Sequence, residues 1–223
     1  MDRKSRSEEI LKEHGVLINA TLSRIANEDE ARLKSPEEIV KRVVTAFLIM
    51  QIAIDICNDN GAAESVEFFT PILERFGLRD ELTEDEKPYF DPEVCDDISQ
   101  DDAYQMQWRL EMCVALFWAC GFMEELPYPS EMTDTTEQIQ LIGGCQSFDE
   151  LMSNVKMRSL GEILDAADLI FRMDWACVEA RLKNDPSIIG DLYPDVVVEQ
   201  HKGFNWLIGA YDAENWDTVL PHT

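Results

Sequence analysis

The chain has 223 residues, of which 45% are hydrophobic and 29% are charged. It holds 45 Asp and Glu against 19 Lys and Arg, which gives a formal net charge of −26 at pH 7. The apolar content and the five Trp exclude an intrinsically disordered chain in spite of this charge. The acidic excess opposes binding to nucleic acids and to anionic membrane surfaces, because both depend on Lys and Arg.

The charge is unevenly distributed along the chain. Residues 1–42 carry nine bases and nine acids, whereas residues 43–223 carry ten bases and thirty-six acids. A basic protein or a small cation is therefore the electrostatically natural partner. The alternative is that the acidic surface only keeps the protein dispersed in solution. We expect no nucleic-acid and no membrane partner, and the sequence leaves the oligomeric state open.

The N-terminus and the cysteines predict a cytoplasmic protein. The charged start is not followed by an apolar stretch, so it does not resemble a secretory signal. The longest apolar stretches, 43–57 and 112–123, are interrupted or too short for a membrane-spanning helix. The six cysteines form no Cys-x-x-Cys pair, and most lie in apolar helical patterns, which is typical of reduced, buried thiols.

Helix-start signals recur along the chain. Ser35, Pro36 and Glu38 combine a capping Ser, a Pro at the first helical position and a Glu that can reach back to the cap. The same Ser/Thr-x-x-Glu pattern occurs at Ser5–Glu8, Thr83–Glu86, Ser147–Glu150 and Ser159–Glu162. With the apolar periodicity, these signals predict helices near 5–14, 36–59, 62–76, 83–90, 100–121, 147–155, 160–183 and 194–209.

Three of these segments have the apolar content of core helices. The segment 36–59 is apolar on nearly all faces, 100–121 is apolar in its second half, and 160–183 carries an apolar stripe. No strand-like alternation is longer than 196–198. We therefore predict an all-α fold, with residues 1–223 forming a single compact domain of about eight helices in which shorter helices surround long central ones.

Two stretches are predicted loops with a possible functional role. Residues 79–102 hold eleven acids and two bases, with Pro88 and Pro92 limiting helix length. Residues 122–146 hold two Pro and the pair Gly143-Gly144. Loops of this length in a compact domain are often functional or mobile.

Charged residues inside the apolar helices are the first candidate site. Asp168 and Arg172 stand four residues apart, the spacing of an ion pair on one helix face. If the helices pack together, Arg109, Glu111, Asp165 and Arg172 can form one buried network. This network is either a substrate pocket or a structural device that holds the helices in register. The candidate residues in these two helices are Trp108, Arg109, Glu111, Asp165, Asp168, Arg172 and Trp175.

A second group of candidates lies near the C-terminus. Asn205, Trp206, Trp216 and Asp217 place hydrogen-bonding groups beside large apolar surfaces. They line a pocket, or the two Trp anchor the end of the chain to the core.

Motifs for metal or cofactor chemistry are absent from the sequence. The chain has no Glu-x-x-His pair, no calcium-binding loop, no Gly-rich phosphate loop and no nucleophile elbow. Its His residues, at 14, 201 and 222, have no ligand partner at helical spacing. We expect no metal and no cofactor, and the sequence identifies no catalytic residue.

The order of several motifs resembles domain of unknown function family 4272. The matching segments are Arg3-Lys4-x-Arg6-Ser7 with Leu11 and Gly15-Val16, residues 35–38, 108–111, 116–121 and 125–129, Arg172 with Trp175, and residues 205–207 through Trp216-Asp217. The chain departs from the family's pattern at Leu22-Ser23, where Leu-Pro is expected, in an acidic insertion around 91–102, and in the loop 135–150. The resemblance implies a cytoplasmic, largely helical protein and supplies no activity or substrate.

Two functions from different classes fit the sequence. The first is a non-enzymatic interaction module, similar to an immunity or inhibitor protein, whose acidic surface at 79–102 and 122–150 docks a basic protein. The second is an enzyme or small-molecule binder, in which Arg109 and Arg172 orient an anionic ligand and Glu111 or Asp165 acts as the base. The charge asymmetry and the missing catalytic motifs favour the first.

Overall fold

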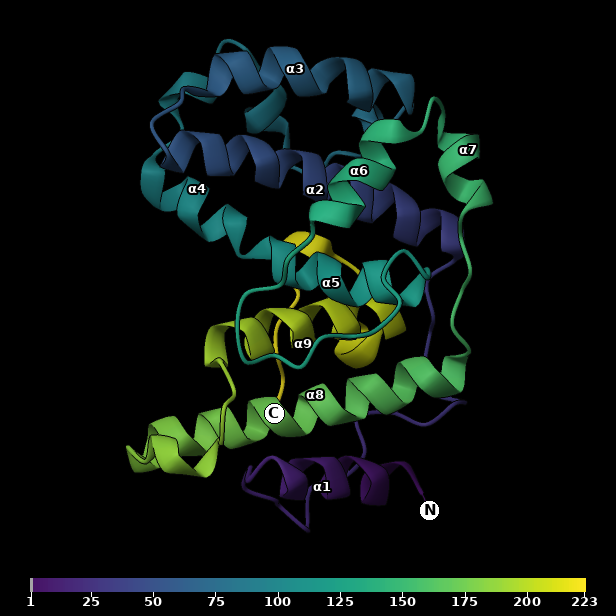
Figure 1. The fold of residues 1–223 in the computed structure, drawn as a ribbon, viewed down its shortest axis with the longest axis vertical. Helices are drawn as coiled ribbons and strands as arrows, with labels where there is room; N and C mark the ends of the chain where they lie inside the picture. The colour runs from purple at the N-terminus through teal and green to yellow at the C-terminus, as the bar shows by residue number, and fades with distance from the viewer. Residues whose placement is uncertain (1) are drawn as a thin grey trace. The chain divides into compact units, whose positions relative to one another are not determined.

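The computed structural model describes residues 2–223 and confirms the all-α class (Figure 1). Over these residues the regular elements are helices, and one isolated antiparallel bridge joins Val16 to Ile189. The chain divides into two compact units, each built from separate segments. Unit 1 contains Met1–Lys34, Glu125–Thr133 and Arg158–Thr223, and unit 2 contains Ser35–Glu124 and Asp134–Met157. That residues 1–223 act as a single domain stays a prediction.

Unit 1 is built around the long helix α8 (Leu160–Lys183). Helix α1 (Arg3–Glu13) packs on one side of α8 and α9 (Pro194–Ile208) on the other (Figure 1). Short 3-10 turns complete the unit: η4 (Pro186–Ile188), η5 (Ala210–Asp212) and η6 (Trp216–Thr218). The core contains apolar residues of all three helices, including Leu11, Ile163, Leu164, Ala167, Val196, Val197, Phe204 and Leu207.

Unit 2 is built around α2 (Pro36–Cys57), which contacts α3 (Ala62–Arg75), α4 (Gln100–Gln107) and α5 (Arg109–Ala119) (Figure 1). Phe47 of α2 meets Phe117 of α5 edge to face, with 5.4 Å between ring centroids, and both side chains are buried. The remaining elements are η1 (Arg79–Glu81), η2 (Lys87–Phe90), η3 (Cys95–Asp97), α6 (Thr136–Gly144) and α7 (Phe148–Ser153).

Two predicted capping boxes form in full. At the starts of α2 and α8, the Ser hydroxyl accepts from the N–H of the Glu three residues on, and that Glu accepts from the N–H of the Ser. Hydrogen bonds from the side chain and the backbone of Ser159 lower the pKa of Glu162, so this cap stays ionised at neutral pH. The box predicted at Ser5 is wrong, because Asp2 caps α1 and Ser5 lies inside that helix.

Other differences from the sequence prediction have local causes. The segment predicted as one helix over 100–121 is interrupted at Trp108, which separates α4 from α5. In the segment predicted as a helix over 83–90, only the 3-10 turn η2 forms. Glu86 still accepts from the N–H of Thr83, but the Glu86 carboxylate also pairs with Arg42 of α2. Helix α6 lies within the stretch predicted as a loop over 122–146, and Gly143-Gly144 stand at its end.

Gly190 allows a close approach of two backbone segments in unit 1. Its φ is +56°, and a Cβ atom at this position would overlap the carbonyl oxygen of His14. Gly15 has a similar φ of +67°, but nothing lies within 4 Å of where its Cβ would be. Substitution of Gly15 would cost stability through its backbone conformation alone, whereas substitution of Gly190 would cost stability through both the conformation and the overlap.

We predict that Gly190→Ala lowers the stability of the protein more than Gly15→Ala does. The left-handed conformation alone costs an L-residue about 1–2 kcal/mol, which is the loss expected for Gly15→Ala. Gly190→Ala should lose more stability than this, because the new Cβ atom must also displace the His14 carbonyl group. Urea unfolding of both variants measures the difference, and equal losses would show that the contact at Gly190 is not tight.

Candidate functional site

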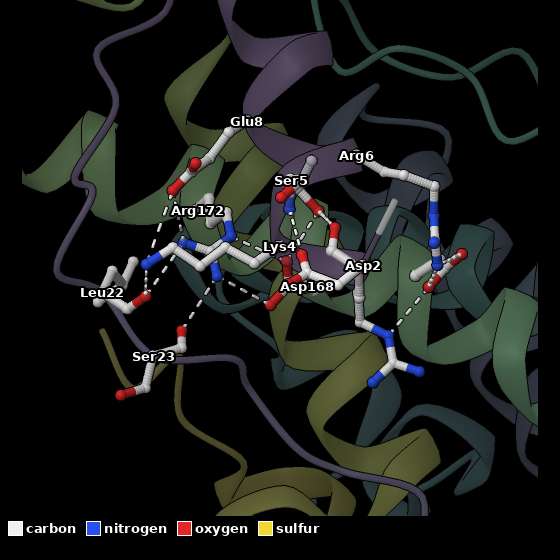
Figure 2. Close-up of polar contacts among 12 residues, drawn as sticks. Asp2, Lys4, Ser5, Arg6, Glu8, Leu22, Ser23, Asp168 and Arg172 are labelled. Carbon is white, nitrogen blue, oxygen red and sulfur yellow. Dashed lines mark hydrogen bonds and ion pairs between the residues drawn. The ribbon is translucent and has the colours of Figure 1, made fainter.

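A buried ion pair on α8 is the centre of the polar network in unit 1 (Figure 2). Arg172 Nε lies 2.8 Å from Asp168 Oδ2, and Arg172 Nη2 lies 3.2 Å from Asp168 Oδ1. Asp168 is fully buried, and Arg172 is 2% exposed. The two residues form the pair that their spacing predicts.

The same pair binds two other segments of unit 1 to α8. Ser7 of α1 donates a 2.8 Å hydrogen bond to Asp168 Oδ2. Arg172 donates to the carbonyl oxygens of Leu22 and Ser23, at 3.4 and 3.2 Å (Figure 2). Most of the guanidinium donors are thus used within the protein, so Arg172 has little capacity left to orient a ligand.

Arg3 extends this network along α1. Its guanidinium lies 2.9 Å from Asp165 and 2.5 Å from Glu28, and it donates to the carbonyl oxygen of Ala26 at 3.0 Å. Burial acts to lower the pKa of Arg3, but the hydrogen bonds to Asp165 and Glu28 outweigh it and the pKa is raised. Arg6 also pairs with Asp165, at 2.6 Å. Asp165 is therefore engaged by two arginines.

The sequence prediction of the site did not include Arg3, Arg6 or Ser7. All three belong to the basic run that opens the first helix, and that run formed part of the family resemblance. Nothing local in the sequence indicates that this run faces residues about 160 positions away.

Trp108, Arg109 and Glu111 lie in unit 2. Arg109 pairs with Asp85 at 2.9 Å, and Trp108 meets Tyr104 edge to face. Glu111 is fully buried in α5. The ion pairs described here for Arg109 and Arg172 lie within their own units, so a single network joining these four charges stays a prediction.

The C-terminal candidates cluster around two tryptophans in unit 1. Trp206 and Trp216 meet edge to face at 5.2 Å, and the Lys34 ammonium lies 5.4 Å from the Trp206 ring centroid. Asn205 donates to the carbonyl oxygen of Leu220 at 2.9 Å.

The N–H of Asp217 donates to Asn215 in the η6 turn. Trp175 is half-buried on α8. The contacts of Asn205, Trp206 and Trp216 connect α9 to the end of the chain, as anchoring requires.

A pocket of about 800 Å³ adjoins the network of Arg172. Residues 21–27, 30–32 and 208–212 line it together with Lys4. Lys4 donates to the carbonyl oxygen of Leu22 at 3.0 Å, and Arg32 pairs with Asp212 at 3.3 Å. A third cation, Arg24, also lines the pocket and is exposed. Because Lys4 and Arg32 are engaged by the protein itself, the pocket offers less positive charge to an anion than its composition indicates.

One buried polar pair was not predicted from the sequence. Asp174 of α8 and His201 of α9 lie 2.8 Å apart through Oδ2 and Nδ1, and both are at most 1% exposed. The two residues are 27 positions apart on different helices, so no sequence pattern indicates that they are partners.

Unit 2 carries most of the negative charge. It contains 24 acids and 7 bases, a formal charge of −17. Within the described segment 79–102, ten of the eleven acids are exposed, and Glu86 is buried beside Arg42 at 2.7 Å. Four large apolar side chains of the same unit are exposed: Phe68 by 65%, Val94 by 41%, Tyr104 by 53% and Ile139 by 43%.

Across residues 2–223, no three His, Cys, Asp or Glu side chains are grouped so that they could hold a metal ion. No helix in this part of the chain combines the length and apolar character that crossing a membrane requires.

Comparison with known proteins identifies one family. The model of the family described as "Domain of unknown function (DUF4272)" matches residues 3–219. No curated protein and no solved structure matches the chain.

Two ion pairs on α8 give a matched test of the buried network. Asp168–Arg172 and Glu179–Lys183 have the same i,i+4 spacing, but the first pair is buried, whereas in the second Lys183 is exposed and Glu179 is partly exposed. We predict that Asp168→Asn destabilises the protein by about 3–5 kcal/mol, because it leaves the buried Arg172 charge with only the more distant carboxylate of Glu8, 4.0 Å away.

The matched variant Glu179→Gln should cost less than about 1 kcal/mol, because water screens that pair. Chemical denaturation of both variants gives the comparison. Similar losses for the two would mean that the buried pair does not hold α1 and residues 22–23 against α8.

Proposed function

We propose that this chain, which belongs to the DUF4272 family, is a non-enzymatic interaction protein that presents an acidic surface to a basic protein partner. The surface is the acidic arc, defined as residues 79–102 of unit 2. The observation that carries the proposal is that this segment is folded, with ten of its eleven carboxylates exposed and with Leu82, Tyr89 and Phe90 buried.

The acidic arc is anchored to unit 2 by buried side chains. Leu82, Tyr89, Phe90 and Cys95 are each at most 6% exposed. Glu86 adds an ion pair to Arg42 of α2. A surface held in place before binding loses less conformational entropy when a partner docks, which raises the affinity that the same contacts give.

Many of the arc's carboxylates are not neutralised. Glu81, Glu84 and Asp85 pair with cations of unit 2. In contrast, no cation of the described chain lies within ion-pair distance of a second set of exposed acids: Asp80, Glu93, Asp96, Asp97 and Asp101. Free surface carboxylates attract a basic partner over long range and orient its approach.

Exposed apolar side chains beside the arc supply the second component of an interface. Val94 lies within the arc, and Phe68 lies on α3, which contacts η3 of the arc. Tyr104 follows on α4. Charge steers association, but buried aromatic and aliphatic contacts usually carry most of the binding energy. The partner that fits is therefore a basic segment that also bears apolar residues.

The enzyme alternative has less support. Arg172 is 2% exposed with most of its donors used, and Glu111 is fully buried. In that hypothesis Arg172 orients the ligand and Glu111 is one of two candidate bases. The other candidate base, Asp165, is paired with Arg3 and Arg6. A cytoplasmic location remains part of the proposal, and it agrees with six free cysteines, of which all but Cys57 are buried.

We predict that the arc binds a synthetic amphipathic peptide of Lys, Arg and Leu, with a dissociation constant that rises steeply with salt. The triple variant Asp96→Asn, Asp97→Asn, Asp101→Asn should weaken binding about tenfold or more, because it removes unpaired charge at the site itself. Fluorescence anisotropy with a labelled peptide measures both effects.

The control removes the same charge from unit 1. Glu9, Glu13 and Asp29 are exposed acids that form no ion pair with a cation among residues 2–223. The variant Glu9→Gln, Glu13→Gln, Asp29→Asn should leave binding within about twofold. Equal weakening by the two triple variants would show that the peptide responds only to total charge, and the proposal would then fail.

A further inference from the structure

A second pocket of unit 1 lies between the C-terminal half of α8, η4 and the start of α9. Its volume is about 590 Å³, within the usual range for sites that bind small molecules. Most of its wall is apolar, formed by Val178, Ala180, Pro186, Ile189, Val198 and Pro221. It is separate from the acidic arc, which belongs to unit 2.

Asp174 places a buried carboxylate in the wall of this pocket. The residue is 1% exposed, and its Oδ2 lies 2.8 Å from His201 Nδ1. Its Oδ1 is buried and has no hydrogen-bond partner among residues 2–223. A buried carboxylate oxygen without a donor destabilises the protein, so the site favours a ligand that supplies a donor.

The other charged residues of the pocket make it negative. Asp185 and Asp195 line it together with Asp174, and Arg181 is the one cation among the described lining residues. Hydrogen bonds from the side chain and backbone of Ser187 lower the pKa of Asp185, so it is ionised at neutral pH. An anionic ligand would meet three carboxylates here, whereas a cation would be attracted.

Cys177 adds a thiol to the pocket wall but no nucleophile. Burial and the nearby Asp174 raise its pKa to about 12, so the thiol is protonated at neutral pH. The thiolate is the reactive form of cysteine. The pocket therefore has the character of a reversible binding site.

We propose that this pocket binds a small organic cation, an ammonium group attached to an apolar alkyl or aryl body. The ammonium donates a hydrogen bond to the free Oδ1 of Asp174, while His201 holds the other oxygen. The apolar body contacts Val178, Ile189 and Val198. Both halves of the ligand contribute, because the wall is apolar and a buried carboxylate binds a charged donor more strongly than a neutral one.

The test compares three probes by isothermal titration calorimetry. We expect 2-phenylethylammonium to bind, and neutral 2-phenylethanol of the same shape to bind at least about tenfold more weakly. Methylammonium, which has the charge but no apolar body, should also bind at least about tenfold more weakly. If methylammonium or the alcohol binds as well as 2-phenylethylammonium, then surface charge or apolar contact alone accounts for binding, and the proposal is overturned.

Three variants test whether the ammonium ligand binds in this pocket. Asp174→Asn should abolish the preference for the ammonium over the alcohol, whereas Asp191→Asn, an exposed acid outside the pocket, should leave it unchanged. Because Asp174→Asn disturbs the contact with His201, a second variant is Val198→Trp, which fills the pocket and leaves that contact in place. Retained binding in Val198→Trp would overturn the proposal.

A spectroscopic signal reports the contact itself. The ring resonances of His201 in the folded protein should shift on addition of 2-phenylethylammonium, because the ligand changes the charge distribution on the carboxylate that His201 contacts. Unchanged His201 resonances at saturating ligand would place the ammonium elsewhere and overturn the assignment to Asp174.

Discussion

A charged pair buried in a helical core needs hydrogen-bond partners from the protein, because water cannot reach it. The arrangement of unit 1 depends on this requirement. Asp168 and Arg172 lie on α8 where water does not reach them. Their remaining hydrogen-bonding capacity is met by Ser7 of α1 and by the carbonyl oxygens of Leu22 and Ser23. These partners come from distant parts of the chain. The hydrogen bonds of Asp168 and Arg172 therefore fix the positions of α1 and of residues 22–23 against α8.

Unit 2 uses a similar arrangement for a different purpose. The buried pair of Arg42 and Glu86 lies beneath a segment whose other acids face solvent. The buried carboxylate of Glu86 and the buried apolar side chains of this segment hold it in place, and so they fix the positions of its ten exposed acids. Asp174 of unit 1 has one carboxylate oxygen that is buried and has no donor among residues 2–223. This oxygen is the observation from which we propose a ligand site in unit 1.

The candidate site was predicted only where its partners are close in sequence. The pairing of Asp168 with Arg172 followed from a spacing of four residues on a helix. The partners of Arg3, and the pairing of Asp174 with His201, depend on how separate helices pack, which no local pattern encodes. Arg109 was recognised as a charge in an apolar helix, but Asp85 as its partner was not.

The sequence by itself determined the all-α class, the starts of α2 and α8 at their capping boxes, and the acidic character of residues 79–102, because these properties depend on neighbours within a few positions. The tertiary structure alone decided how separate segments combine into two units, that Trp108 interrupts a helix, and which carboxylates are buried. The reason is physical: packing and desolvation are set by residues that are distant in the chain, and their free energies exceed local preferences where the two compete.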